Sequence, residues 1–476
     1  MNLKFPSYEI ISEPLLSFHF DRVEDNSIHP LIGLKKFGPY SKSTVGDVYD
    51  PIRIAVIVPF GTRGVIKNLF RELRNAHEPR ERKQYLIDYP GFKNIFGVNF
   101  AVGPPNTLIE LPSQLDQRLN SNEKPHLCLA EALSNALAVL NRQKSQFDVV
   151  LIYLPERWRH CFVYKNEGHE DFDLHDYLKA ITAQFGIPSQ IILEDSALNY
   201  HCRASVMWRL SIALYTKAGG VPWKLANISP STAFIGISYS LKNDGDKNRF
   251  ITCCSQVFDS DGSGLEFLTY ETQNVNMHYR NPFLNRNDMG NLMSRSLNLY
   301  QKRHNGQLPR RVVVHKSTDF KNEEIKGCYD ALHSIEDVNL LHIQESVNWQ
   351  GTKIVKKPQW NKGFSDFYPV DRGACVQIDD YEMLLWTQGN MTNFSGKNYY
   401  KEGKGIPKPL LIKRFAGHGS MIQDCKEILG LTKMDWNNDA VYTKLPVTMT
   451  YAQVLSRTIK RMPNLKSYPY QVRFFM

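Results

Sequence analysis

The chain alternates between short apolar runs rich in β-branched residues and amphipathic stretches with helical spacing. Continuous apolar runs occupy residues 52–60, 147–155 and 189–194, and helical spacing fills residues 61–76, 126–143 and 174–185. Buried strands that alternate with helices are typical of a parallel sheet with crossover helices. We therefore predict an N-terminal extension without regular pattern over residues 1–50, followed by a Rossmann-like α/β domain over residues 51–230.

The second half has a different pattern. Three apolar runs joined by short turns come first, over residues 232–241, 249–259 and 264–271. Helical patterns over residues 287–304 and 322–335 then alternate with apolar runs over residues 310–317 and 338–346. Three strands joined by short turns indicate an antiparallel meander. A meander followed by alternating helices and strands is the order of an RNase H-like fold, which we predict for residues 231–476.

Length and charge narrow the class of protein. A chain of 476 residues is too long for one compact core, which favours two domains. Its 58 Lys and Arg exceed its 48 Asp and Glu, a net charge of +10 that suits a polyanion such as nucleic acid. The ordinary alternative is a basic cytosolic protein, because the basic residues are dispersed.

Cysteine usage and hydropathy point to a cytoplasmic protein. The eight cysteines form no Cys-x-x-Cys pair, which argues against a finger-type zinc site and favours reduced, mostly buried thiols. No apolar run approaches the roughly 18–20 residues of a membrane span, and no signal peptide is recognised at the start. We expect a cytoplasmic protein that does not span a membrane.

One helix and its successors carry a candidate phosphate site. In the helix over residues 174–185, His175 and Lys179 are four residues apart and so lie on one face, where both can reach one phosphate. Gln190 opens the next strand, and Lys217 closes the next helix before Gly219 and Gly220. The ordinary alternatives are solvated surface residues and, for Lys217, a favourable interaction with the helix dipole.

These residues and their order resemble the MID domain of Argonaute proteins. The resemblance rests on His175-x-x-x-Lys179, on Gln190 after "IPS", on Lys217 in "KAGG", and on "AFIGI" as the first strand of a PIWI domain. It implies that the four polar side chains hold the 5′ phosphate of a guide strand. The tail "YPYQVRFFM" resembles the Argonaute C-terminus, whose terminal carboxylate lies beside that phosphate, and this adds Met476 to the predicted site.

One position departs from the family pattern. Ala213 lies one turn before Lys217, where some relatives have a polar or cationic group that supports a metal ion or the phosphate. An alanine side chain can support neither a metal ion nor the phosphate, so the sequence does not establish a cofactor for this chain. Mg²⁺ at the guide 5′ phosphate stays the one candidate.

The resemblance also identifies where a nuclease site would lie. Slicing Argonautes hold two divalent cations with carboxylates, and this chain has Ser238, Ser317 and Gln453 at three of those positions. Serine and glutamine do not supply the anionic oxygens that this chemistry needs. The expectation is a catalytically inactive protein. A nuclease with relocated ligands, such as Asp319, and an unguided single-strand binder are the alternatives.

From about residue 50 onward the chain resembles a short prokaryotic Argonaute, with no room for N-terminal and PAZ domains. The resemblance implies a guide-dependent sensor that pairs a guide RNA with a complementary single-stranded target DNA. It implies a heterodimer with an APAZ-effector protein, sirtuin-like or TIR, with the sirtuin-like type favoured. Target pairing would activate this partner to consume NAD⁺ in defence against plasmids or phage.

Overall fold

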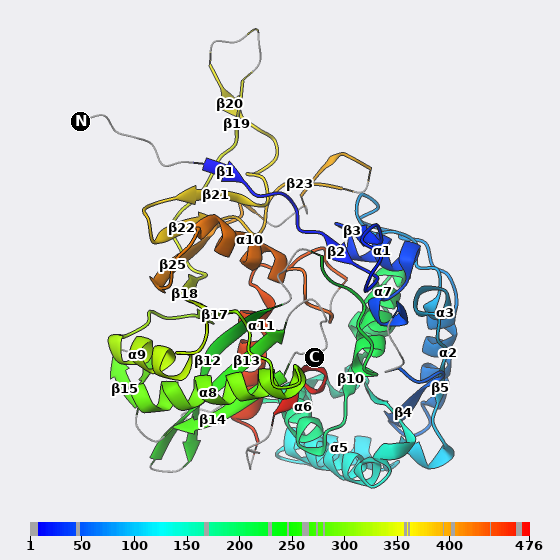
Figure 1. The fold of residues 1–476 in the computed structure, drawn as a ribbon. Coiled ribbons are helices and arrows are strands. Elements are labelled where there is room, and N and C mark those ends of the chain that lie inside the picture. Colours follow the sequence, from blue (N-terminus) through cyan, green and yellow to red (C-terminus); the bar gives the residue numbers. More distant parts are fainter. Residues whose placement is uncertain are drawn as a thin grey trace, which may run out of the picture.

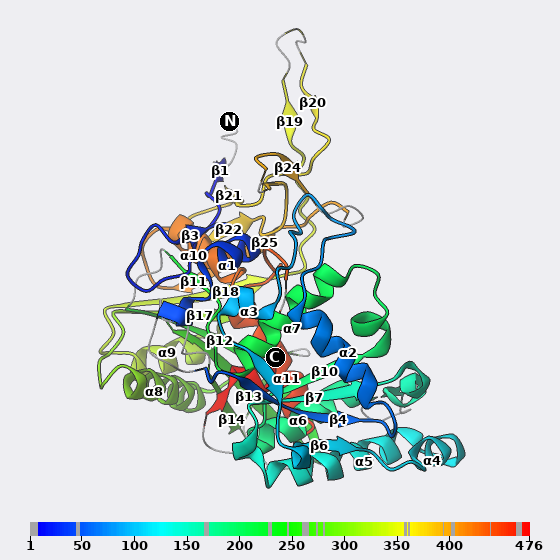
Figure 2. The same cartoon turned by 90° about the vertical axis from the view of Figure 1, so that its right-hand side faces the viewer.

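The chain forms two lobes, each built on one large sheet (Figures 1 and 2). The computed structural model describes residues 8–43, 48–165, 171–226, 231–244, 247–258, 266–272, 275–278, 281–356, 359, 362–393, 395–400, 405–437, 439–462 and 469–476. The predicted boundary near residue 230 falls on residues 227–230, which lie outside the described residues.

A parallel five-stranded sheet is the centre of the first lobe. Its middle strand β4 (Ile52–Val58) pairs with β7 (Val149–Leu154), and β10 (Ser189–Leu193) continues the sheet beyond β7. On the other side β4 pairs with β5 (Phe100–Val102) and then with β6 (Leu108–Glu110). The predicted parallel sheet is confirmed.

Helices cover both faces of this sheet because its strands are apolar on both. Ile54, Val56 and Val58 of β4 pack towards α2 (Arg63–Arg74) and α7 (Arg203–Lys217). Ala55 and Ile57 pack towards α5 (Pro125–Asn141) and α6 (Leu174–Phe185). Successive residues of a strand point to opposite faces, so an uninterrupted apolar run is what a doubly covered strand requires. Two shorter helices, α3 (Phe92–Phe96) and α4 (Leu115–Ser121), complete the lobe.

The second lobe contains a mixed sheet of ten strands. Its central strand β12 pairs antiparallel with β13 on one side and parallel with β17 on the other. Across the sheet the order is β1 (Tyr8–Ile10), β21 (Ala374–Gln377), β22 (Glu382–Leu385), β25 (Leu410–Ala416), β18 (Asp337–Gln344), β17 (Arg311–Lys316), β12 (Thr232–Asp244), β13 (Lys247–Phe258), β14 (Glu266–Thr272) and β26 (Tyr470–Gln471). The predicted RNase H-like order of meander and parallel strands is confirmed.

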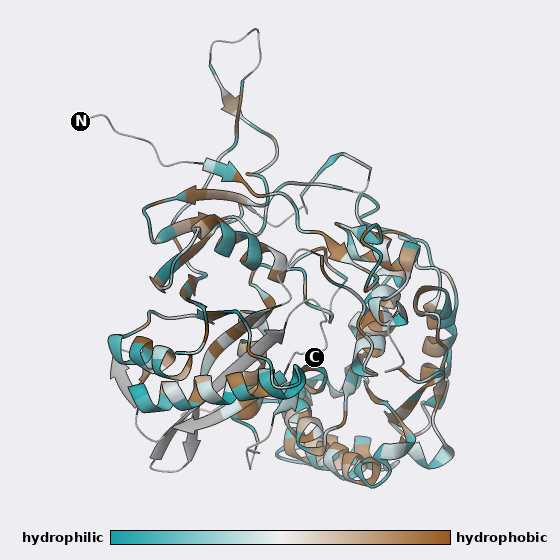
Figure 3. Cartoon of the chain, viewed as in Figure 1, coloured by the Kyte–Doolittle hydropathy of each residue, from teal (hydrophilic) through white to brown (hydrophobic). Residues whose placement is uncertain are grey.

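Two helices lie against one face of this sheet and a third lies against the other. Helix α8 (Arg286–Arg303) alternates hydrophilic and hydrophobic residues along its length (Figure 3), and it packs with α9 (Asn322–Ala331) over β12 and β17. Helix α11 (Val447–Ile459) contacts β12 and β13 and also α6 of the first lobe. It is therefore part of the contact between the lobes. Helix α10 (Met421–Leu431) packs near β22.

Small pairings complete the described structure. Two-residue or four-residue strands pair as β8 (Val163–Tyr164) with β9 (Phe172–Asp173), β15 (Val275–His278) with β16 (Asn281–Leu284), β19 (Ile354–Val355) with β20 (Phe364–Ser365), and β23 (Met391–Thr392) with β24 (Asn398–Tyr399).

The first residues do not lack regular structure, contrary to the prediction for residues 1–50. Strand β1 pairs with β21 at the edge of the large sheet. Strand β2 (Leu16–Ser17) pairs with β3 (Asn26–Ser27) and with β11 (Lys224–Leu225), and α1 (Pro30–Phe37) follows. The pairings of β1 with β21 and of β2 with β11 join residues hundreds of positions apart, and local periodicity carries no signal for such pairings.

The burial predicted for the cysteines is seen in the six whose side chains the structure describes. Six cysteines are described as free and buried, namely Cys128, Cys161, Cys202, Cys328, Cys375 and Cys425. Within the described part of the chain, no helix combines the length and the apolar character needed to cross a membrane.

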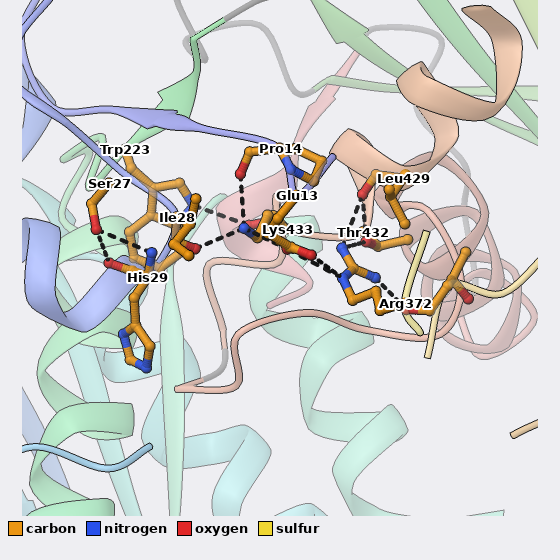
Figure 4. Close-up of polar contacts among 11 residues, drawn as sticks. Glu13, Pro14, Ser27, Ile28, His29, Trp223, Arg372, Leu429, Thr432 and Lys433 are labelled. Atoms are coloured by element: carbon orange, nitrogen blue, oxygen red, sulfur yellow. Dashed lines mark hydrogen bonds and ion pairs between the residues drawn. The ribbon is translucent and has the colours of Figure 1, made fainter. Parts of the chain in front are cut away.

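A buried ionic network fixes the N-terminal segment to the second lobe (Figure 4). The Glu13 carboxylate accepts from Arg372 at 2.9 Å and from Lys433 at 2.7 Å, and both cationic side chains are fully buried. The Lys433 ammonium also donates to the carbonyls of Pro14 at 2.8 Å and Ile28 at 2.7 Å. Burial alone would raise the pKa of Glu13, but the two cations outweigh it and lower that pKa.

We expect Glu13→Gln to lower the free energy of unfolding by about 3–5 kcal/mol, because it leaves two buried cations without their anion. Thermal unfolding measures the loss, and Glu9→Gln on the exposed strand β1 is the matched control. Since the folded pKa of Glu13 lies below its unfolded value, its contribution is present above the unfolded pKa and is lost as the pH falls through the folded one. Equal stability of the two variants would contradict this role.

Candidate functional site

A cavity of about 270 Å³ opens where the first lobe meets the end of the chain. It is lined by α6, β10, the segment after β10 and α7, together with one loop residue and the last residue of the sequence. The lining residues are His175, Lys179, Gln190, Ile191, Leu193, Ser196, Ala197, Val206, Arg209, Leu210, Ala213, Lys217, Asn437 and Met476. All five predicted site residues therefore lie around one cavity.

Helix α6 positions Lys179 at the base of this cavity. The helix begins at Asp173, whose side chain accepts from the Asp176 amide at 3.0 Å, and it ends at Gly186 in the left-handed conformation, as the sequence predicts. Lys179 is only 2% exposed. Its ammonium donates to the Ser189 carbonyl at 2.7 Å and to a backbone oxygen of Met476.

Helix α7 brings Lys217 to the opposite wall. Lys217 is 1% exposed and donates to the side-chain oxygen of Gln190. Each of the two positions that follow requires glycine for a different reason. Gly219 has a φ of 107°, and a Cβ on Gly220 would lie 2.2 Å from the ring of Tyr215. The helix therefore has to stop at this point, which fixes where the Lys217 side chain leaves it.

Two buried ammonium groups share one cavity without a side-chain carboxylate among its lining residues. Burial lowers the pKa of Lys179 to about 7. Burial, and then repulsion from Lys179, lower the pKa of Lys217. Placing two cations so close in a low-dielectric site is unfavourable unless an anion joins them. The cavity is therefore suited to a compact, multiply charged anion such as a phosphate.

His175 and Met476 occupy different parts of the site. The His175 side chain is 60% exposed at the rim, and its Nδ1 lies 3.5 Å from the Asp176 carboxylate. Met476 is buried between the two lobes (Figures 1 and 2) and touches the cavity through the contact with Lys179. His175 can add a donor from the solvent side, whereas Met476 closes the inner side.

Arg209 lines the cavity and was not in the predicted set. It precedes Ala213 and Lys217 at intervals of four residues, so the three lie along one face of α7. The Arg209 guanidinium lies 3.9 Å from the buried carboxylate of Asp439. The spacing alone could have found this residue, because Arg209 lies one turn before Ala213, the position where some relatives have a polar or cationic group.

Among the residues that the structure describes, no side-chain carboxylate lines the cavity, so a Mg²⁺ ion at the guide phosphate would depend on oxygens of Gln190, Asn437 and Met476 and on the phosphate itself. This ion takes oxygen ligands in octahedral geometry and is usually held by carboxylates. Ala213 offers no ligand, the two lysines are cationic, and no Asp or Glu side chain is among the cavity residues that the structure describes.

The positions of the expected nuclease ligands lie on the other lobe. Ser238 is on β12 and is 7% exposed, Ser317 directly follows β17, and Gln453 is an exposed residue of α11. Among the described residues, the one group of three His, Cys, Asp or Glu side chains with ligand atoms within 4.8 Å is Asp173, His175 and Asp176. That group lies at the start of α6, away from this sheet.

Asp319, the residue named for a relocated metal site, has a different partner. Its carboxylate lies 2.9 Å from Nδ1 of His342, which is 9% exposed in its side chain. Burial is the main cause that lowers the pKa of His342. One carboxylate beside one imidazole gives two ligands, fewer than a two-metal site requires.

Comparison with known proteins supports the fold. Residues 161–347 match the Piwi domain family. No curated protein matches the sequence significantly.

Solved structures of prokaryotic Argonautes share the whole described architecture. Clostridium butyricum Argonaute, bound to a guide DNA and a 19-mer target DNA, has a TM-score of 0.67 at 15% identity over 99% of this chain and 55% of its own. Aquifex aeolicus Argonaute has a TM-score of 0.60 at 16% identity over 99% of this chain and 56% of its own. The chain thus spans little more than half the length of these relatives. Its fold is a Rossmann-like MID domain followed by an RNase H-like PIWI domain.

The buried lysines predict a pH-dependent affinity for an oligonucleotide with a 5′ phosphate. Because the pKa of Lys179 is about 7, a phosphate that binds at higher pH must recruit a proton to the neutral amine. We expect affinity to fall by up to about tenfold per pH unit from pH 7 to 9. Fluorescence anisotropy across this range measures it, with the 5′-hydroxyl oligonucleotide as control. A flat profile for the phosphorylated ligand would contradict the assignment.

Proposed function

We propose that this protein is a guide-dependent nucleic-acid sensor. It binds a small 5′-phosphorylated guide RNA and a complementary single-stranded DNA, and it does not cleave the paired strand. The observation that carries the proposal is the pair of buried lysines, Lys179 and Lys217, in one cavity with Gln190 and His175. A terminal phosphate monoester fits this cavity better than an internal phosphate, because it carries more charge and ends the strand.

Base pairing supplies the sequence specificity. Clostridium butyricum Argonaute, whose fold this chain shares, has been solved with a guide and a target strand. The net charge of +10 favours contact with a polyanion along its backbone. When a protein contacts only the sugar-phosphate backbone, the target sequence is recognised by base pairing with the guide, as in other guided systems.

We propose that the target strand is not cleaved because of the residues at the expected metal positions of the second lobe. Ser238, Ser317 and Gln453 stand where slicing relatives are expected to hold metal ions. Asp319 is paired with His342 and not with further carboxylates. These residues support binding without cutting, so the paired state has to act through something else.

We propose that pairing with the target acts through a partner protein. In our proposal the chain forms a heterodimer with an APAZ-effector protein, of the sirtuin-like or TIR type, and target pairing activates this partner to consume NAD⁺. The outcome is defence against plasmids or phage by arrest of the cell. The support is the family resemblance of the sequence, together with the proposed lack of cleavage.

The first test is discrimination at the guide 5′ end. We expect a 5′-phosphorylated guide to bind at least about 100-fold more tightly than the same guide with a 5′ hydroxyl, because two charge-assisted contacts are lost. Lys179→Ala combined with Lys217→Ala should remove this difference. Lys302→Ala combined with Lys326→Ala, two exposed lysines of α8 and α9, is the matched control. Equal binding of both guides to the wild type would refute the proposal.

The second test follows the fate of the target and of NAD⁺ in one reaction. We expect a guide-matched DNA to stay intact in Mg²⁺ or Mn²⁺, while NAD⁺ falls only when the co-expressed effector and a matched target are both present. Gel analysis of labelled target and an NAD⁺ assay give the two readouts. Metal-dependent cleavage that Asp319→Ala abolishes would establish the nuclease alternative instead.

A further inference from the structure

Two further cavities adjoin the phosphate cavity. The nearer, of about 400 Å³, shares Arg209 with it. The farther, of about 520 Å³, shares Arg82, Tyr399 and Tyr400 with the nearer one. The shared residues make the three cavities neighbours in a row. We name the two outer cavities the tyrosine trough, after the residues that line it: Tyr85, Tyr200, Tyr399, Tyr400 and Tyr442.

The trough lies between the two lobes. One wall is the segment around residues 81–85 and Tyr200 of the first lobe, and the other is formed by residues near β24 and by residues 439–444 of the second. Figure 2 shows the long connection before α3 rising beside β24. The trough is therefore an interlobe surface that continues from the phosphate cavity.

Its aromatic rings are held in place. The Tyr200 hydroxyl donates to Glu81 at 2.6 Å, and the Tyr400 hydroxyl donates to the Gly405 carbonyl at 2.9 Å. The rings of Tyr85 and Tyr399 lie 5.2 Å apart. Tyr85 is buried, whereas Tyr200, Tyr399 and Tyr400 are half-buried. Half-buried rings anchored by their hydroxyls, as in Tyr200 and Tyr400, offer flat apolar faces at a small entropic cost, and nucleobases stack on such faces.

The charges along the trough leave a small positive excess. Four cations line it, Arg82, Lys83, Arg209 and Lys444, against the carboxylates of Glu81 and Asp439. Arg82 pairs with Glu81 at 2.9 Å and Lys444 pairs with Glu345 at 3.2 Å, so the excess rests mainly on Lys83. Asp439 is buried and is held by the Ser205 hydroxyl, which also accepts from Arg82 at 2.6 Å. Asp439 therefore serves to position Arg82 and Arg209.

Arg82 is held in an unusual conformation. Its φ of 52° is in the left-handed region, which a residue other than glycine adopts at a cost. Its guanidinium donates to the Tyr85 hydroxyl at 2.8 Å as well as to Ser205. The cation is thus fixed against an aromatic ring inside the trough, a combination that suits a base and its phosphate.

The polarity of the guide–target duplex decides which of its two nucleic-acid strands can reach this surface. If the guide begins at the phosphate cavity, as proposed above, nothing of the guide extends beyond its 5′ phosphate. The complementary strand runs antiparallel, so the part that continues past this point is its 3′ flank. We propose that the tyrosine trough binds unpaired nucleotides of the target strand on the 3′ side of the guide-paired region. This inference rests on the proposed function.

The test uses the full chain loaded with a 5′-phosphorylated guide. Three DNA targets share the paired region: one ends opposite the first guide nucleotide, one adds three unpaired nucleotides at its 3′ end, and one adds the same three at its 5′ end. We expect the 3′ extension to slow target dissociation by about tenfold, since stacking on aromatic side chains is substantial for each base. The 5′ extension should have little effect.

Two double variants and a modified target test whether the slower dissociation of the 3′-extended target comes from the tyrosine rings of the trough. Tyr200→Ala combined with Tyr400→Ala should abolish the gain from the 3′ extension. Tyr329→Ala combined with Tyr381→Ala, at two exposed tyrosines outside the trough, should retain it. An abasic 3′ extension offered to the wild type should also lose the gain, and this measurement does not depend on how well a variant folds.

The outcomes separate this inference from the proposed function. Equal dissociation of the extended and unextended targets overturns the flank site, and so does an equal gain from the 5′ extension or from the abasic one. In each of these cases the discrimination between guide phosphate and hydroxyl is unaffected. Loss of that discrimination in the wild type would instead overturn the guide assignment on which the flank site rests.

Discussion

The burial of two ammonium groups in one cavity is the constraint on which the rest of the site depends. Lys179 and Lys217 come from helices on opposite faces of the first sheet, and each is almost wholly removed from solvent. Such an arrangement costs stability in the free protein, as the lowered pKa values of both lysines indicate. An anion bound between the two lysines would offset this cost, in addition to the Met476 oxygen that accepts from Lys179.

The fold holds this site between two lobes and not within one. Met476 reaches the base of the cavity from the second lobe, and Asn437 and Asp439 come from a loop of that lobe. The buried network of Glu13, Arg372 and Lys433 fixes the N-terminal segment against the same lobe. An anion that settles beside Lys179 therefore touches groups from both halves, which gives ligand binding a physical route to the contact between them.

The second lobe has Ser238, Ser317 and Gln453 at the positions that the family resemblance predicts for metal ligands. The register of β17 determines which neighbouring charges face those positions. Lys316, next to Ser317, lies on the opposite face of the sheet, where it pairs with Glu324 at 2.6 Å in a fully buried contact beneath α9. Since neighbouring residues of a strand face opposite sides, a charge one position away from a ligand position is not available to the same site.

The sequence alone determined the elements with strong local signals and the residues with fixed spacing. The doubly covered strand β4, the capped helix α6 and the placement of His175 and Lys179 on one face follow from periodicity and capping. Gln190 and Lys217 are candidates from their places at the start of a strand and the end of a helix, Met476 is added through the family resemblance, and the structure places all three around one cavity. Only the tertiary structure decided that β1 closes the edge of the large sheet, that Arg209 lies beside Asp439, and that tyrosines from both lobes share a trough. These contacts join residues hundreds of positions apart, and they follow from packing between elements, which local pattern does not encode.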